Sequence, residues 1–67
     1  MKIFAERLKE LREEKGLSIS ALAIATGLHN TAISRWERNQ NNPDVELLVI
    51  IAKFFGVTTD FLLGLEN

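Results

Sequence analysis

Cysteine is absent from this chain of 67 residues, and histidine and proline occur once each. Without cysteine, neither a disulfide framework nor a thiolate metal site can form. The single histidine, His29, has no second soft ligand nearby, so we expect no metal and no cofactor. Long apolar runs are missing too, and the charged, amphipathic start of the chain is typical of neither a membrane span nor a secretory signal. These absences fit a cytoplasmic protein.

A surplus of positive charge is also missing, because the formal net charge is −1. Nucleic-acid-binding domains are usually basic, so this balance argues against such a partner unless the charges are unevenly placed. They are unevenly placed: apart from Glu37, the acidic residues lie within residues 6–14 and 44–66. The middle of the chain, residues 26–43, holds Arg35 and Arg38 against Glu37 alone and is therefore weakly basic.

Residues suited to catalysis are scarce. Glu13 and Glu14 are adjacent, so their carboxylates diverge on a helix and cannot act as a paired acid and base. The glycines are scattered rather than gathered in a loop that would cradle a phosphate. We therefore expect no enzyme and no small-molecule substrate. The length predicts a single domain over residues 1–67, with a core small enough that association would help its stability.

Glycine and proline divide the chain into helix-sized pieces. Glycine is frequent just after a helix, and serine, threonine or aspartate just before one. Apolar residues between these marks recur at helical spacing, as in Phe4, Leu8 and Leu11, and no stretch alternates for long enough to form a strand. The sequence predicts an all-α fold with five helices, at about residues 2–15, 18–25, 29–38, 45–55 and 58–63.

The second and third predicted helices are joined by a tight turn. Gly27 in this turn permits a positive φ. Ala23 lies where the two helices cross, and a larger side chain there would push them apart. Apolar contacts shared by the two helices come from Leu22, Leu28 and Ile33. Residues 18–38 therefore predict a helix-turn-helix.

The third predicted helix has an apolar side and a polar side. Its inner side carries Ile33, Trp36 and Glu37. Its outer side carries Thr31, Ser34, Arg35 and Arg38, with Asn30 at the tip. In a major groove, asparagine pairs with adenine and arginine with guanine through two hydrogen bonds, each pair contributing about 1–3 kcal/mol of discrimination. Taken alone, this face is either a surface that reads DNA or an ordinary hydrated helix face.

Separated anchors along the chain agree in spacing with a known family. They are Arg7-Leu8, Leu11-Arg12-Glu13, Gly16-Leu17-Ser18, Leu22-Ala23, Gly27-Leu28, residues 33–37, Asn42-Pro43, Leu48, Ala52, Gly56-Val57 and residues 60–63. Over nearly its whole length the sequence thus resembles the Cro/phage-repressor-type helix-turn-helix family, which includes many small bacterial regulators of the xenobiotic-response-element-like kind. The resemblance implies a five-helix, lambda-repressor-like domain whose third helix is the recognition helix. It also implies a bacterial or phage-encoded transcriptional regulator, most often a repressor that occupies an operator.

Roles for individual positions follow from the same resemblance, with double-stranded DNA as the partner. It implies base contacts from Asn30, Thr31 and Arg35, with His29 or Ser34 contributing. It implies phosphate contacts, which fix register without reading sequence, from Ser18, Ser20, Arg38, Gln40, Asn41 and Asn42. Behind the recognition helix it implies an ion pair between Arg12 and Glu37. Removing one partner of such a pair costs a few kcal/mol.

Four features depart from the family pattern. Ile19 stands where the family usually has a glutamine that bonds a phosphate and braces the recognition helix. His29 replaces the usual serine or threonine cap, so either the next residue becomes the cap or the helix starts later. Asn39 replaces glycine, although asparagine tolerates the left-handed conformation. Gln40 and Asn41 replace basic residues, which lowers the expected affinity for DNA and its salt dependence.

The acidic balance, Ile19 and the neutral loop favour an alternative function, a protein-interaction module on the same fold. Such a module would resemble an antitoxin or a repressor antagonist, and it would show no salt-sensitive duplex binding. The apolar residues Ile19 and Ile24 on the second helix are compatible with contacts to thymine methyl groups, with contacts to a second protein, or with neither.

Apolar residues exceed what the core requires. The inward face of the fourth helix needs only Leu48, Ile51, Ala52 and Phe55. A second stripe is formed by Leu47, Ile50 and Phe54 and is extended by Phe61 and Leu65. A helix that is apolar nearly all round is buried by something. The stripe predicts either tighter packing within the chain or, as we favour, a two-fold homodimer through the fourth and fifth helices, which would read half-sites about one DNA turn apart.

Overall fold

The computed structural model describes residues 1–67 and consists of five helices without a strand. The helices are α1 (Lys2–Glu14), α2 (Ile19–Thr26), α3 (Asn30–Glu37), α4 (Val45–Phe55) and α5 (Thr59–Leu63). The predicted all-α class is confirmed, and no helix end differs from its predicted position by more than one residue.

Short polar side chains set the starts of three helices. Ser18 accepts a hydrogen bond from an amide in the first turn of α2, Asp44 does so for α4, and Thr58 for α5. Each cap satisfies an amide that has no carbonyl partner within its own helix. Because a cap residue lies just outside the helix, α2 and α5 begin one residue later than the sequence predicted.

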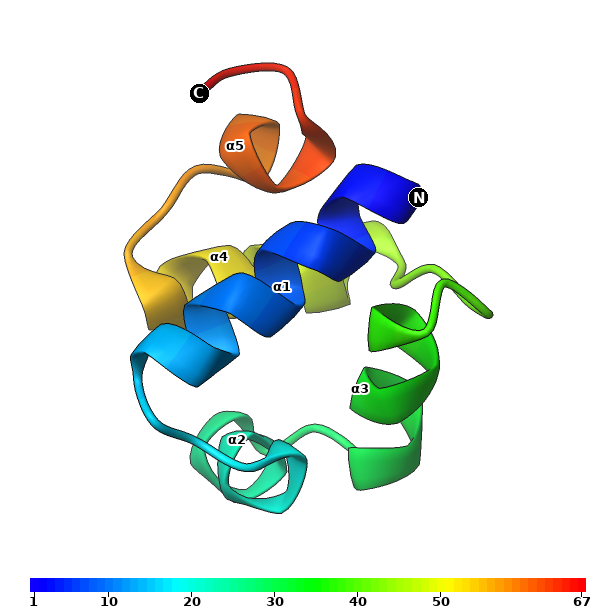
Figure 1. Ribbon diagram of the computed structural model, residues 1–67, viewed down its shortest axis with the longest axis vertical. Helices are drawn as coiled ribbons and strands as arrows, with labels where there is room; N and C mark the ends of the chain where they lie inside the picture. The colour runs from blue at the N-terminus through cyan, green and yellow to red at the C-terminus, as the bar shows by residue number, and fades with distance from the viewer.

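Helix α1 crosses the middle of the molecule and organises the rest of the fold (Figure 1). It packs against α3 and also against α5, while α2 packs against α3 and α4. Both termini lie on the side of α5, at the opposite end of the molecule from the turn between α2 and α3 (Figure 1). The α2–α3 pair is therefore presented at one end of a helical scaffold.

The core joins all five helices through one cluster of apolar side chains. Its buried members are Phe4, Leu8, Leu22, Ala23, Ile33, Trp36, Leu48, Ile51, Ala52 and Leu62. Phe4 of α1 meets Trp36 of α3 edge to face, with ring centroids 6.3 Å apart. Aromatic pairs in this arrangement add about 0.5–1.5 kcal/mol beyond the burial of their area. The core thus holds α3 by its inner face.

Arg7 of α1 fastens the last residues of the chain to the helical scaffold. Its guanidinium lies 4.3 Å from the centroid of the Phe61 ring and donates hydrogen bonds to the backbone carbonyls of Phe61 and Glu66. The hydroxyl of Thr58 donates to the carboxylate of Glu66. These contacts hold the segment after α5 against α1.

Several kinds of feature do not occur in the structure. None of the helices has the length and apolar character needed to cross a membrane. No three side chains of histidine, aspartate or glutamate gather where a metal ion could bind, and no pocket is present.

Candidate nucleic-acid interface

The turn between α2 and α3 depends on a left-handed residue. Gly27 has φ of 74° and closes α2 by donating its amide hydrogen to the carbonyl of Ala23 at 2.9 Å. The hydroxyl of Thr26 donates to the carbonyl of Leu22 at 2.8 Å, one turn earlier in the same helix. Ala23 is buried beneath the turn, as its place at the helix crossing predicted. Helices α2 and α3 therefore meet in a helix-turn-helix.

Helix α3 divides into the two faces that its sequence predicted. Ile33 and Trp36 are buried on its inner face. Thr31, Arg35 and Arg38 are exposed on its outer side, and Ser34 is half-buried. The outer face consequently offers hydroxyl and guanidinium groups to solvent from a helix whose back is anchored in the core.

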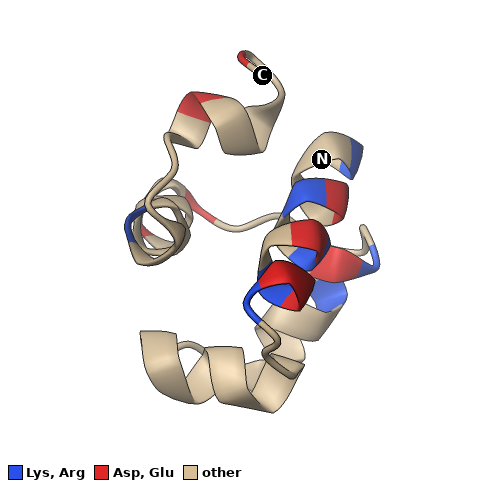
Figure 2. Ribbon diagram, turned by 60° about the vertical axis from the view of Figure 1, so that its left-hand side comes forward, with Lys and Arg blue, Asp and Glu red and all other residues tan.

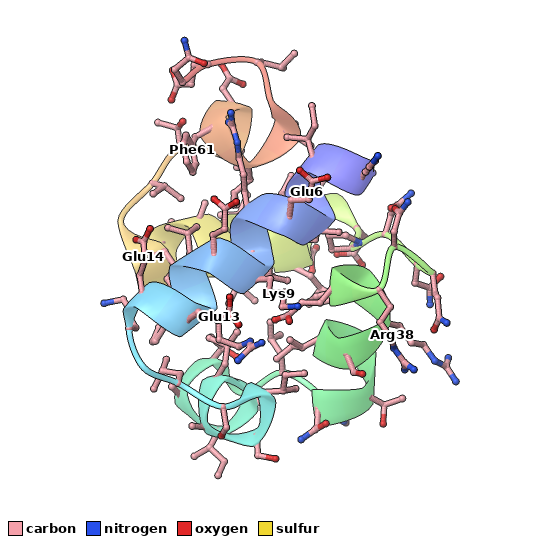
Figure 3. The ribbon with its side chains drawn as sticks, viewed as in Figure 1. Glu6, Lys9, Glu13, Glu14, Arg38 and Phe61 are labelled. Atoms are coloured by element: carbon pink, nitrogen blue, oxygen red, sulfur yellow. The ribbon has the colours of Figure 1, made fainter.

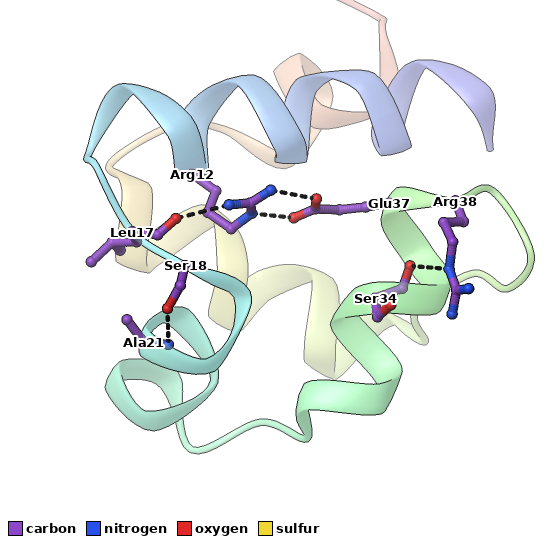
Figure 4. Close-up of polar contacts among 7 residues, drawn as sticks. All are labelled: Arg12, Leu17, Ser18, Ala21, Ser34, Glu37 and Arg38. Atoms are coloured by element: carbon purple, nitrogen blue, oxygen red, sulfur yellow. Dashed lines mark hydrogen bonds and ion pairs between the residues drawn. The ribbon is translucent and has the colours of Figure 1, made fainter.

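A bidentate ion pair joins α1 to the inner side of α3 (Figure 4). The Nε and Nη2 atoms of Arg12 donate to the two carboxylate oxygens of Glu37 at 2.7 and 2.9 Å. Nη1 of Arg12 donates to the carbonyl of Leu17 at 2.8 Å, just before α2 begins. The side chains of the pair are only 12% and 5% exposed. Arg12 thus connects α1, the start of α2 and the end of α3.

The electrostatics of α3 follow from this pair. The hydrogen bonds that Arg12 donates to Glu37 raise the pKa of Arg12 above its ordinary value, against the opposing effect of burial. Because the Glu37 carboxylate is held by Arg12 behind the helix, it does not offset Arg35 and Arg38 on the outer face. The outer face of α3 is therefore more positive than the sequence of residues 26–43 indicates.

The remaining charges are concentrated away from the helix-turn-helix. Helix α1 carries a mixture of acidic and basic side chains, whereas α2 carries no charged residue (Figure 2). Glu6, Glu13 and Glu14 lie along α1, while Arg38 extends outward from the end of α3 (Figure 3). The net charge of −1 therefore describes the whole chain but not its α3 face.

At the start of α3 the structure differs from expectation. His29 occupies the cap position without a side-chain hydrogen bond, and Asn30 is already the first helical residue. Nδ2 of Asn30 donates to the Ser20 hydroxyl oxygen of α2 at 2.6 Å. The expectation that Asn30 becomes the cap is therefore wrong, and α3 begins directly after His29, one residue later than predicted. Sequence reasoning missed this bond because the two residues belong to different helices, and no helical spacing relates them.

The loop that follows α3 contains three of the positions expected to contact phosphates. Asn39 adopts a positive φ of 56°, the conformation that the usual glycine would supply. Gln40 and Asn41 are exposed. The side-chain oxygens of Asn39 and Asn42 accept hydrogen bonds from the Met1 ammonium group at 3.1 and 2.7 Å. The side-chain oxygen of Asn42 is thus engaged within the molecule, whereas its amide nitrogen makes no hydrogen bond there, and Gln40 and Asn41 face solvent.

The second apolar stripe is only partly used within the chain. Leu47, Phe54 and Phe61 are half-buried and pack against the core. Phe54 also meets the Phe55 ring edge to face at 5.0 Å. Ile50 and Leu65, in contrast, are 39% and 73% exposed. Internal packing therefore accounts for three residues of the stripe and leaves the other two at the surface.

The α2–α3 unit, with a buried inner face and a polar outer face, defines a helix-turn-helix protein. The chain belongs to the helix-turn-helix family, whose pattern matches residues 8–62. The resemblance that the sequence anchors indicated is confirmed. Ile19, one of the departures from the family pattern, is half-buried and packs against the core.

Known proteins similar to this chain include a transcriptional activator and a repressor. It is 44% identical over 64 residues to the HTH-type transcriptional activator BcrR of Enterococcus faecalis, covering 96% of this chain and 31% of that protein. It is 33% identical over 61 residues to repressor protein C2 of Salmonella phage P22, covering 91% of this chain and 28% of the repressor. The chain therefore spans less than a third of the length of either relative.

One solved structure matches almost over its full length. The restriction-modification controller protein C.AhdI from Aeromonas hydrophila has a TM-score of 0.81 and 33% sequence identity with this chain. The match covers 91% of this chain and 92% of the controller. The five-helix arrangement is thus shared with a protein of similar size.

Proposed function

We propose that this chain is a sequence-specific DNA-binding domain that regulates transcription, with α3 as the helix that enters the major groove. The outer face of α3 carries the proposal, because Arg35 and Thr31 are exposed on a helix that the core and the Arg12–Glu37 pair hold in place. Base contacts would come from this face and its tip, through His29, Asn30, Thr31, Ser34 and Arg35. The similarity to an activator, a phage repressor and a restriction-modification controller supports this class of function.

Phosphate contacts in this proposal flank α3 on both sides. They would come from Ser18, Ser20, Arg38, Gln40, Asn41 and Asn42. Arg38 is exposed, and its Nε donates to the carbonyl of Ser34 at 3.3 Å, which leaves the terminal nitrogens to face a phosphate. The chain would act as a repressor, by occupying an operator in the bacterial cytoplasm and blocking access of polymerase.

We further propose that two copies associate through α4 and α5 around a two-fold axis. Ile50 and Leu65 supply exposed apolar surface there, beside the half-buried Leu47, Phe54 and Phe61. A symmetric dimer would place its two recognition helices on half-sites about 34–36 Å apart, one turn of DNA. The preferred operator would then be an inverted repeat.

Selection of bound duplexes from a random DNA pool, at low and moderate salt, tests the proposal. Enrichment of an inverted repeat, with affinity that falls as salt rises, is the expected result. The competing function is a protein-interaction module, favoured by Ile24, whose side chain on α2 is 84% exposed. Selection without enrichment, together with salt-independent or absent duplex binding, would reject the DNA-binding function in favour of that alternative.

A further inference from the structure

The hydrogen bond between Ser20 and Asn30 connects α2 directly to the first residue of the recognition helix, α3. Nδ2 of Asn30 donates to the hydroxyl oxygen of Ser20 at 2.6 Å, and both residues are exposed. Asn30 is the first residue of α3, and its side-chain amide makes no other hydrogen bond within the molecule. The orientation of this amide therefore depends on Ser20.

Ile19, the residue before Ser20, cannot make a side-chain hydrogen bond to α3. Its side chain is apolar, is half-buried and packs against the core. Ser20, one position further along α2, instead points its hydroxyl at the start of α3. The contact that braces the recognition helix is consequently made by Ser20, one position after the place where the family usually has glutamine. The serine side chain is also shorter than that glutamine.

The donor and acceptor of the Asn30 amide remain usable in this arrangement. An asparagine amide has two N–H donors and an oxygen acceptor, and a serine hydroxyl both accepts and donates. With one N–H bound to Ser20, the second N–H and Oδ1 are left to pair with N7 and the N6 amino group of adenine. Rotation of the amide by half a turn would turn Oδ1 toward Ser20, and the hydroxyl could then keep the bond only by donating its own hydrogen. A Ser20 hydroxyl that already donates to a phosphate could not do so.

We propose that Ser20 is a positioning residue for base recognition: with its hydroxyl hydrogen donated to a phosphate, it can only accept from the Asn30 amide, which fixes the donor and acceptor ends of that amide and so the base preferred at that position. This inference rests on the proposed DNA-binding function. Fixing the side chain before binding also removes part of the ordering cost that recognition would otherwise incur. The hydroxyl hydrogen of Ser20 stays available for a phosphate, so Ser20 would couple a backbone contact to a base contact.

The test compares S20A, S20T and N30A with the wild-type chain on an enriched operator and on its single-base variants. S20A should lower discrimination by about 3- to 10-fold, the effect of one hydrogen bond, only at the base pair that N30A also relaxes. S20T keeps the hydroxyl and should retain the wild-type preference. In the S20A/N30A double variant, discrimination at that base pair should fall no further than in N30A alone.

R38A serves as the matched control, because it removes an expected phosphate contact without touching Asn30. A loss in S20A that is uniform over all sequences, as expected for R38A, would overturn the positioning role while leaving the DNA-binding function intact. NMR of the free protein further separates a positioning role from a simple phosphate contact. If Ser20 positions Asn30, S20A should increase the mobility of the Asn30 side-chain amide without any DNA present. An unchanged Asn30 amide would overturn the inference, whereas absence of any sequence preference in the wild-type chain would reject the proposed function itself.

Discussion

Arg12 and Glu37 face each other with both carboxylate oxygens on separate guanidinium nitrogens, 25 residues apart in the chain. The third guanidinium nitrogen of Arg12, Nη1, donates to the carbonyl of Leu17. The pair is nearly excluded from water, so desolvation offsets much of its attraction. Its main effect is on geometry, because it fixes the back of α3 relative to α1 and the start of α2.

Removing one member of the pair should be costly. Arg12→Ala leaves the Glu37 carboxylate buried without its partner and should lower the free energy of unfolding by about 3 kcal/mol. The raised pKa of Arg12 means that its contribution is present at every pH below its ordinary, strongly basic value and is lost only above it. The loss on substitution should therefore be the same at pH 6 and pH 8. Urea unfolding at both values measures it.

A double-mutant cycle provides the control for the pair. Arg12→Met combined with Glu37→Leu removes both charges and should cost clearly less than the sum of the two single substitutions. Additive losses would show that the two side chains contribute independently of each other.

Gly27→Ala should destabilise the helix-turn-helix through backbone strain alone. A Cβ added there meets no atom within 4 Å, but φ is 74°. The left-handed conformation costs about 1–2 kcal/mol for a residue with a side chain, so unfolding should become easier by about that amount. Gly16→Ala is the matched control, because its φ of 68° and its open surroundings are equivalent. A cost well above the control would point to a steric role for Gly27 that the structure does not contain.

Arg35 and Arg38 lie on the same exposed side of α3 but should respond differently to substitution. Arg35→Ala should relax preference at one base pair by about 1–3 kcal/mol. Arg38→Ala should weaken binding to all sequences and reduce the slope of log affinity against log salt by about one. Competition binding on operator variants at several salt concentrations distinguishes the two effects. Equal behaviour of the two variants would contradict the division between base and phosphate contacts.

Ile50→Glu should dissociate the proposed dimer without disturbing the fold. Phe54 is less suitable for this test, because it is half-buried against the core and its replacement would also destabilise the monomer. Ile50 is more exposed, so a charge there affects mainly the proposed contact with a second copy. Analytical ultracentrifugation at micromolar concentration measures the change, and Val45→Glu, which alters another exposed apolar residue of α4, serves as the control. Sedimentation of the wild-type chain as a monomer at high micromolar concentration would contradict the dimer.

Much of this molecule is determined by local chemistry and could be predicted from the sequence. Helical spacing of apolar residues, with caps at Ser18, Asp44 and Thr58, predicts all five helices with their ends. Such signals act within one or two turns and do not require the rest of the fold. The inner face of α3, which includes Ile33 and Trp36, follows from the same periodicity.

Tertiary structure decided which polar side chains meet and which apolar ones remain outside. The Ser20–Asn30 bond and the contact of Arg7 with Phe61 join different helices, so no periodic pattern contains them. In the sequence, every residue of the second apolar stripe is equally suited to burial. Packing of α4 on its neighbours nevertheless half-buries Phe54 and leaves Ile50 more exposed. Spacing along a helix determines the direction of a side chain, whereas its partner depends on how the helices pack, and that depends on all of the core at once.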